Sequence, residues 1–220
     1  MNGSTGDPSA ESWGRRHSRE SMVRQQLRAR GICDERVLAA MGRVPRHRFV
    51  RERDEASAYA DSPLPIGFGQ TISQPYIVAL MTELLAPRVG MAVLEIGTGC
   101  GYQTAILAAL GLRVHSLEVV PALAEAARGR LASLGLDRGV SIVVGNGRLG
   151  LPQAGPFAGI VVTAAPEALV PAWGEQLEEG GRLVVPIGAR HEQWLRRYTK
   201  SGGALRREDL MAVRFVPLIE

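Results

Sequence analysis

The chain has 220 residues, of which 45% are hydrophobic and 22% are charged, and its formal net charge is +4. These values are those of an ordinary soluble protein with one domain and a substantial core. The sequence also excludes a membrane-spanning protein, because no stretch approaches the roughly 18 uncharged apolar residues that a span needs. We expect no secretory signal at the N-terminus.

The cysteines and histidines indicate neither a disulfide framework nor a metal site. Cys33 and Cys100 are far apart and belong to no Cys-x-x-Cys pair. The four histidines lack the spacing of metal ligands. We therefore expect a reducing, cytoplasmic location and no bound metal.

Positive charge is concentrated in the first quarter of the chain. Twelve arginines and only four acids lie between Arg15 and Arg53. Such a segment can indicate nucleic-acid binding. Here the arginines are scattered along helical periods, and no aromatic residues alternate with them to stack on bases. We therefore expect neither a nucleic-acid nor a membrane partner.

Residues 1–20 lack hydrophobic periodicity, so we expect a disordered leader there and a single domain over residues 21–220. That domain begins with a helical segment. Apolar residues recur at helical spacing from Met22, Gly31 ends the run, and Asp34 can cap a second short helix.

The segment from Asp61 to Gln74 contains two prolines and two glycines, and we expect a shaped loop with no regular element. Pro75 then begins a helix with a buried apolar face. Ser73 and Gln74 therefore lie at a helix N-terminus. Free backbone N–H groups there favour an anion such as a carboxylate.

From Gly90 onward, apolar strands alternate with helices. We expect strands at 92–96, 113–117, 140–144, 159–163 and 183–187, and helices at 102–110, 121–134 and 167–177. This alternation indicates an α/β fold, with a parallel sheet covered on both faces. The segments 194–199 and 213–218, joined through Ser201-Gly202-Gly203, indicate a closing antiparallel hairpin.

A glycine-rich turn follows the strand that ends near Glu95 and precedes a helix. Its residues are Gly97-Thr98-Gly99-Cys100-Gly101. Glycine permits a sharp turn and a close approach of a ligand to the backbone. The spacing is Gly-x-Gly-x-Gly and differs from that of dinucleotide binders. An acid at Glu95 suits a cationic amine and sulfonium, so we predict S-adenosylmethionine, although the motif alone also fits a plain tight turn.

Two later features are in register with this turn. Glu118 ends the second strand, 21 residues after Gly97, where a carboxylate accepts hydrogen bonds from ribose hydroxyls. Gly145-Asn146-Gly147 follows the next strand, and Asn146 is placed to hydrogen-bond the adenine amino group. Alone, Glu118 also fits a helix cap, and the second motif also fits a plain turn.

Several segments resemble the protein-L-isoaspartate O-methyltransferase family and follow the order of that family from about residue 22 to residue 218. They are Leu64-Pro65-Ile66-Gly67, Gly69-Gln70-Thr71-Ile72-Ser73-Gln74-Pro75, Val93-Leu94-Glu95-Ile96-Gly97-Thr98-Gly99, Gly145-Asn146-Gly147, Gly180-Gly181-Arg182-Leu183 and Phe215-Val216-Pro217-Leu218. Many methyltransferases share the glycine turn. The segment that contains Ser73 is far more specific.

The resemblance implies a Rossmann-like methyltransferase fold: a mostly parallel seven-stranded sheet with helices on both faces and an antiparallel hairpin near the edge. It also implies S-adenosylmethionine-dependent methylation of isoaspartyl residues in damaged proteins and peptides, with Ser73 as the active-site serine. The cofactor-binding residues that we expect are Gln70, Thr71, Ile72, Glu95, Gly97, Thr98, Gly99, Gly101, Glu118, Asn146 and Gly147. The expected substrate-binding residues are Ile66, Gly67 and Val216.

Two residues depart from the family pattern. Cys100 stands where serine is usual, and Asn146 stands where an aspartate is usual near the adenine. The sequence leaves three alternatives open: a methyltransferase for another carboxylate on a modified peptide or small metabolite, an NAD-dependent dehydrogenase, and an inactive binding module. It also leaves the oligomeric state open, with a monomer favoured.

Overall fold

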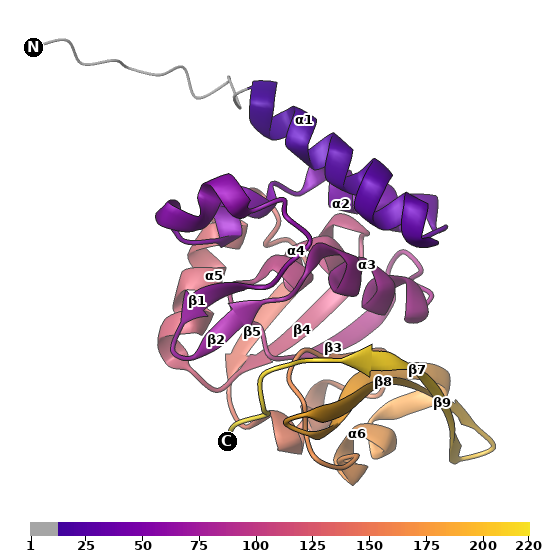
Figure 1. Cartoon of the computed structure of the whole chain (residues 1–220). Coiled ribbons are helices and arrows are strands. Elements are labelled where there is room, and N and C mark those ends of the chain that lie inside the picture. The colour runs from indigo at the N-terminus through magenta and orange to yellow at the C-terminus, as the bar shows by residue number, and fades with distance from the viewer. Residues whose placement is uncertain (1–12) are drawn as a thin grey trace, which may run out of the picture.

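The computed structural model describes residues 13–220 and centres on a seven-stranded sheet (Figure 1). The strands lie in the order β5-β4-β3-β6-β7-β8-β9. Their bounds are β3 (Ala92–Ile96), β4 (Arg113–Glu118), β5 (Val140–Val144), β6 (Phe157–Val162), β7 (Leu177–Ala189), β8 (Glu192–Ser201) and β9 (Ala204–Val213). Strands β3 to β7 pair in parallel, and β8 is antiparallel to both of its neighbours. This is the mostly parallel sheet with an edge hairpin that the sequence predicts.

The chain reverses its direction of travel across the sheet beside β3. It first adds β4 and β5 on one side, then returns to place β6 and β7 on the other. In open α/β sheets, ligands bind outside the carboxyl ends of the strands at such a reversal. The sheet order alone therefore places a binding site between the ends of β3 and β6.

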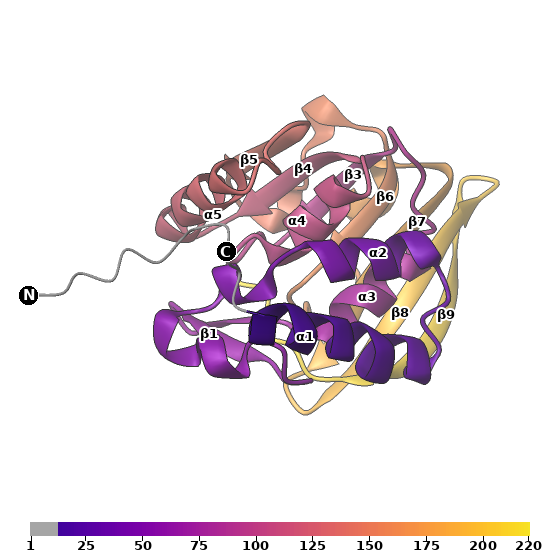
Figure 2. The same ribbon diagram turned by 90° about the horizontal axis from the view of Figure 1, so that it is seen from above.

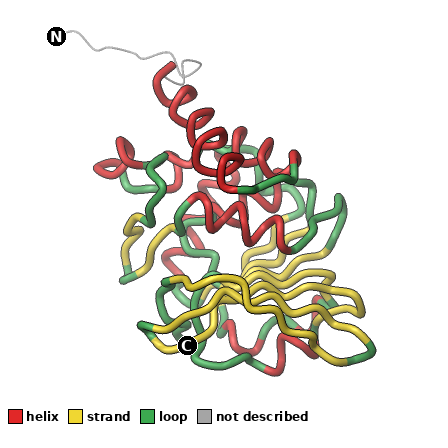
Figure 3. The backbone as a smooth tube through the Cα atoms, turned by 45° about the vertical axis from the view of Figure 1, so that its right-hand side comes forward, coloured by secondary structure: helices red, strands yellow, loops and turns green. Residues whose placement is uncertain are grey.

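Helices cover both faces of the sheet unequally (Figures 1 and 2). The elements on one face are α2 (Glu35–Arg43), α3 (Pro75–Leu84), α4 (Tyr102–Ala109) and α5 (Pro121–Ser133). The other face packs against the short helix α6 (Pro171–Glu175), whose Trp173 is fully buried. Figure 3 shows the twisted strands as one layer with most of the helices above it.

Alternate residues of each central strand enter the two different cores. Val93 packs with α3 and α4, whereas its neighbour Leu94 packs with the layer around α6. Because successive side chains of a strand point to opposite faces, a strand buried on both sides is apolar throughout. This accounts for the apolar run of β6 and, apart from Glu95, for that of β3.

The expected leader is helical in its second part. Helix α1 spans Trp13–Ser21, and residues 1–12 lie outside the described residues. Polar contacts hold this helix in place: the Arg19 Nε donates to the Gly42 carbonyl at 2.8 Å, and Arg15 pairs with Glu55. A search for apolar periodicity misses a helix that is anchored by guanidinium groups. The helical segment after it consists of a π-helical turn (Met22–Leu27) and a 3-10 turn (Arg28–Arg30), followed by α2 with its Asp34 cap.

The segment before α3 contains a regular element, contrary to the expectation of a loop. Strands β1 (Leu64–Gly67) and β2 (Gln70–Ile72) form a separate antiparallel hairpin. Proline is tolerated in a strand that needs no donor on its outer side, as in this two-stranded hairpin. The tip is tight: Gly67, Phe68 and Gly69 all have positive φ angles, of 99°, 53° and 72°.

The C-terminal hairpin is shifted from its expected position. Its second strand is β9, and the segment 214–218 instead crosses the carboxyl ends of the sheet. There the Ala165 N–H donates to the Val216 carbonyl at 2.8 Å, and the Leu218 N–H donates to the Ala165 carbonyl at 2.9 Å. Strand β9 lies at the edge and exposes a charged run, so it lacks the apolar alternation that marks a strand. Helix α6 is shorter than expected because Pro171 begins it.

Within residues 13–220, no helix is long and apolar enough to cross a membrane.

Candidate active site

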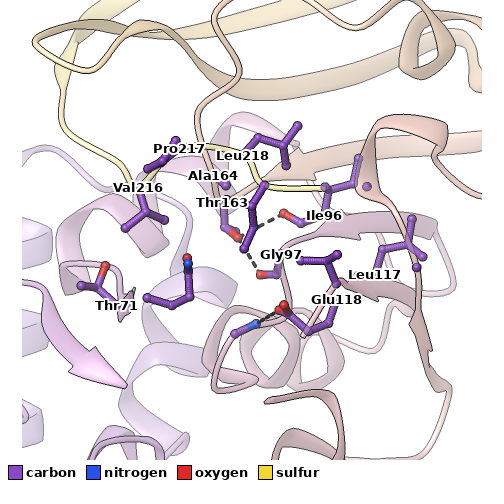
Figure 4. A pocket seen from close by; sticks show the side chains of 16 residues that line it. Thr71, Ile96, Gly97, Leu117, Glu118, Thr163, Ala164, Val216, Pro217 and Leu218 are labelled. Carbon is purple, nitrogen blue, oxygen red and sulfur yellow. Dashed lines mark hydrogen bonds between the residues drawn. The ribbon is translucent and has the colours of Figure 1, made fainter. Parts of the chain in front are cut away.

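A cleft lies at the carboxyl ends of the parallel strands, where the sheet order places a binding site (Figure 4). We call it the inner cleft. It is lined by Gln70, Thr71, Ile96, Gly97, Gly99, Leu117, Glu118, Val119, Gly145, Gly147, Thr163, Ala164, Val216, Pro217, Leu218 and Ile219. The turns after β3, β4, β5 and β6 therefore meet the hairpin β1–β2 and the C-terminal segment around one space.

The glycine turn after β3 lies against the end of β6. Gly97 has a φ of +95°, and a Cβ atom there would lie 2.4 Å from the Thr163 Oγ1. That hydroxyl donates to the Gly97 carbonyl at 2.6 Å and also lies 3.1 Å from the Ile96 carbonyl oxygen (Figure 4). Only glycine fits this backbone geometry and this contact together. Gly99, with a φ of +54°, then turns the chain across the floor of the cleft.

Glu118 links the second strand to the glycine turn. One carboxylate oxygen accepts from the Gly99 N–H at 2.7 Å, and the other accepts from the Val120 N–H at 3.0 Å. The side chain is only 6% exposed and lines the inner cleft. Each carboxylate oxygen can accept a second hydrogen bond. The arrangement therefore suits a ligand with two neighbouring hydroxyls, such as a ribose.

Glu95 lies beneath the turn and does not line the cleft, so the expectation that its charge faces a cationic ligand is wrong. It is completely buried, and one carboxyl oxygen accepts from the Thr104 hydroxyl at 2.5 Å and from the Ser116 hydroxyl at 2.8 Å. Burial raises the pKa of Glu95 to about 8, against the hydrogen bonds that favour its charged form. At neutral pH this acid is therefore mostly uncharged.

Thr98 belongs to the same buried layer. Its side chain is 3% exposed, and its hydroxyl lies 2.6 Å from the Ser116 hydroxyl. Ser116 in turn donates to Glu95. A chain of hydrogen bonds thus supports the glycine turn from below.

Two further spaces adjoin the inner cleft. A side pocket lies between the glycine turn and α3, and its lining includes Ile72, Ser73, Thr98, Cys100 and Gln103. An outer cleft extends from Ser73 to the C-terminal segment and includes Arg30, Tyr76, Arg190, Arg214 and Val216. Thr71 and Thr163 line all three spaces, and Ser73 lines the side pocket and the outer cleft. The junction of the three spaces lies at these hydroxyls.

Asn146 shapes the edge of the inner cleft without lining it. Its side-chain oxygen accepts from the Arg148 N–H at 2.9 Å and caps the 3-10 turn Gly147–Leu149. A Cβ atom at Gly147 would lie 2.5 Å from the Ile96 Cγ2, and the Trp173 indole donates to the Gly147 carbonyl at 2.9 Å. The turn is therefore held against β3 and α6. The neighbouring glycines, and not the amide, form the wall of the cleft.

Three other predicted residues have supporting positions. Ile66 and Gly67 line none of the three spaces, in contrast to the predicted substrate contacts. A Cβ atom at Gly99 would lie 3.3 Å from the Ile66 Cδ1, which places Ile66 against the glycine turn. Gly67 forms the hairpin tip. Gly101, with a φ of +89°, allows α4 to approach Ala127 of α5.

Thr163 is not among the predicted site residues, although it lines all three spaces. It follows directly after β6, the strand beside β3 at the reversal of the sheet, and only the strand order reveals that position. Arg30 and Arg214 were also missed. No local motif marks them, because separate segments of the chain bring them to the outer cleft.

Comparison with known proteins identifies relatives over nearly the whole chain. A model of the family described as protein-L-isoaspartate(D-aspartate) O-methyltransferase (PCMT) matches residues 17–220. The protein-L-isoaspartate O-methyltransferase of Opitutus terrae is 52% identical over 204 residues, which cover 92% of this chain and 87% of that protein. The enzyme of the same name from Methylorubrum populi is 53% identical over 203 residues, covering 92% and 95%.

A solved structure has the same fold. It is described as a putative protein-L-isoaspartate O-methyltransferase from Plasmodium falciparum in complex with S-adenosyl-L-homocysteine. Its TM-score with this chain is 0.80 at 27% sequence identity, and the match covers 91% of this chain and 98% of that one.

We expect Gly97→Ala to weaken the binding of S-adenosylhomocysteine about ten-fold or more, because the new methyl group displaces Thr163 from the turn. Isothermal titration calorimetry measures this loss. Gly90→Ala is the matched control: Gly90 also has a positive φ, of +79°, but a Cβ atom there has no neighbour within 4 Å. Equal losses in the two variants would show that backbone strain, and not the contact with Thr163, is responsible.

We expect Glu95→Gln to flatten the pH dependence of stability. The folded-state pKa of about 8 lies above the ordinary value of 4.5, so ionisation favours the unfolded state. The free energy of unfolding of the wild-type protein should therefore fall as the pH rises from about 4.5 to about 8, at up to about 1.4 kcal/mol per unit. Denaturant titrations across this range measure the slope. Glu178→Gln, at an exposed residue of β7, should keep the wild-type slope, and an unchanged slope in Glu95→Gln would contradict the assignment.

Proposed function

The chain belongs to the protein-L-isoaspartate O-methyltransferase family and methylates L-isoaspartyl residues of damaged proteins with S-adenosylmethionine, and we propose that its three adjoining spaces divide this reaction between cofactor and substrate. The observation that carries the proposal is the junction at Thr71, Ser73 and Thr163. A methyl group passes from cofactor to substrate only where their two sites meet.

The inner cleft and the side pocket fit the cofactor. Gly97 has no side chain, so its backbone is accessible where a ligand approaches the turn. Each carboxylate oxygen of Glu118 can accept one more hydrogen bond, and the two together suit the two ribose hydroxyls. The side pocket continues past the glycine turn to Gln103, whose amide group suits the amino-acid end of the cofactor. It reaches Ser73 where it joins the outer cleft. When bound, S-adenosylmethionine supplies an activated methyl group on a sulfonium.

Ser73 is the residue that we assign to the substrate carboxylate. A carboxylic acid with a pKa of about 4 is already ionised at neutral pH, so the reaction needs no general base. Within the described chain, the Ser73 hydroxyl has no hydrogen-bond partner, and it precedes the N-terminus of α3, where free N–H groups favour an anion. The hydroxyl donates to one carboxylate oxygen and directs the other towards the methyl group.

The residues on both sides of Ser73 are held in place. Ile72 is 3% exposed and packs into the core. The Gln74 side chain donates to Asp61 at 2.6 Å, and Asp61 also pairs with Arg30. The Arg30 guanidinium lies 3.7 Å from the centre of the Tyr76 ring. A hydroxyl fixed in this way contributes to catalysis through positioning, which is the main contribution available to a displacement without proton transfer.

Two further proposals concern the cellular compartment and the oligomeric state of the enzyme. The free cysteines, Cys33 and Cys100, support a cytoplasmic enzyme, because an exposed thiol such as Cys33 persists in a reducing compartment. We further propose a monomer as the active unit, which the molecular mass in solution tests. Isoaspartyl-containing proteins and peptides are the partners of this site.

We expect the enzyme to transfer labelled methyl groups to an isoaspartyl peptide and not to the same peptide with a normal aspartyl residue. Scintillation counting after incubation with methyl-labelled cofactor measures both. Equal labelling of the two peptides would identify a general carboxyl methyltransferase. Tight cofactor binding with no labelling of either peptide would identify an inactive binding module.

We expect Ser73→Ala to lower kcat about ten- to a hundred-fold, the usual effect of losing one hydrogen bond to a charged group. The affinity for S-adenosylhomocysteine should change little, because the Glu118 and Gly97 contacts remain. Steady-state kinetics and calorimetry measure the two quantities separately. Ser141→Ala, at an exposed residue of β5, is the control. An unchanged kcat in Ser73→Ala would exclude the assigned role.

A further inference from the structure

The outer cleft is lined by several basic side chains. Arg30, Arg190 and Arg214 line it together with His191, and among residues 13–220 neither an aspartate nor a glutamate lines it. The rest of its wall combines the hydroxyls around Ser73 with an apolar part that includes Tyr76, Phe215 and Val216. A ligand in this space therefore encounters positive charge beside an apolar surface.

Two of these arginines are available to a ligand. Arg30 is engaged by Asp61, whereas Arg190 and Arg214 are exposed and take part in no ion pair among residues 13–220. The acid closest in sequence to Arg190 is Glu192, which is exposed and does not line the cleft. The positive charge of this pair is therefore not neutralised within the described chain.

The backbone that carries the two arginines is fixed. Arg190 lies in the turn between β7 and β8, and Arg214 directly follows β9. Gln193 is 4% exposed and binds both backbone groups of Phe215: it accepts from the N–H at 2.6 Å and donates to the carbonyl at 3.2 Å. The residue pair Gln193 and Val213 is also in register between β8 and β9. Arg190 and Arg214 thus start from neighbouring, rigid positions.

We propose that the outer cleft selects isoaspartyl segments that carry further acidic residues beside the isoaspartyl group, and that Arg190 and Arg214 bind those carboxylates. The inference rests on the proposed function, in which the isoaspartyl carboxylate lies at Ser73 in the same cleft. A guanidinium group donates two parallel hydrogen bonds to a carboxylate, which makes arginine suited to this recognition. The apolar wall contacts the remainder of the segment.

The expected size of the selectivity follows from the exposure of the arginines. Exposed ion pairs contribute modestly, which corresponds to about a 1.5- to 5-fold gain in affinity for each arginine. The two together should give roughly a 2- to 25-fold preference if they act independently. The preference should decrease at high salt, because exposed charges are screened.

The test compares two isoaspartyl peptides that differ only in their flanking residues, glutamate in one and glutamine in the other. Both kcat/KM and binding to the enzyme loaded with S-adenosylhomocysteine, measured by fluorescence anisotropy, are determined for wild type and for Arg190→Gln/Arg214→Gln. The control is Arg138→Gln/Arg206→Gln, which removes the same charge from exposed arginines outside the cleft.

The wild type and the control should prefer the glutamate peptide, and the ratio between the two peptides should fall towards one in Arg190→Gln/Arg214→Gln. The proposal is overturned by a wild type without preference, by a preference that survives in this double variant, or by an equal loss for both peptides. Failure of the wild type to methylate either peptide is a different result, because it would contradict the proposed function itself.

Discussion

The whole site depends on the contact between Gly97 and Thr163. The Thr163 hydroxyl fills the space that a side chain at Gly97 would need, and it binds the Gly97 carbonyl. This contact joins the end of β3 to the end of β6, where the order of the sheet reverses. Because Thr163 lines all three spaces, the same contact that shapes the glycine turn also lies at the junction where we propose that cofactor and substrate meet.

Acidic residues support the turn in two different ways. Glu118 holds it from the side by accepting hydrogen bonds from two backbone N–H groups. Glu95 supports it from below as a mostly neutral acid, through Ser116 and Thr98. An ionised group at Glu95 would carry a large desolvation penalty with no cation to offset it. Its role is thus one of hydrogen bonding within the core.

The sequence predicts elements whose stability comes from apolar burial and misses those held by polar contacts. Strands β3 and β5 match their predicted bounds, whereas α1 depends on guanidinium groups and was assigned to the leader. Whether the Glu95 side chain faces the cleft or the core was not predictable, because the sequence of a strand buried on both faces does not indicate which face each side chain takes. Thr163 required the strand order, which is a property of the tertiary structure.

The same physical distinction accounts for the arginine-rich first quarter of the chain. Arg46 is completely buried: its Nε donates to the Ala58 carbonyl at 2.8 Å, and its guanidinium lies 4.9 Å from the centre of the Tyr102 ring. Tyr102 begins α4 directly after the glycine turn, and Ala58 precedes the hairpin that leads to Ser73. Among residues 13–220, no acid pairs with this cation; carbonyl groups and an aromatic face instead replace part of its hydration. Arginines that could indicate nucleic-acid binding thus include one that links the segment carrying Ser73 to the helix after the glycine turn.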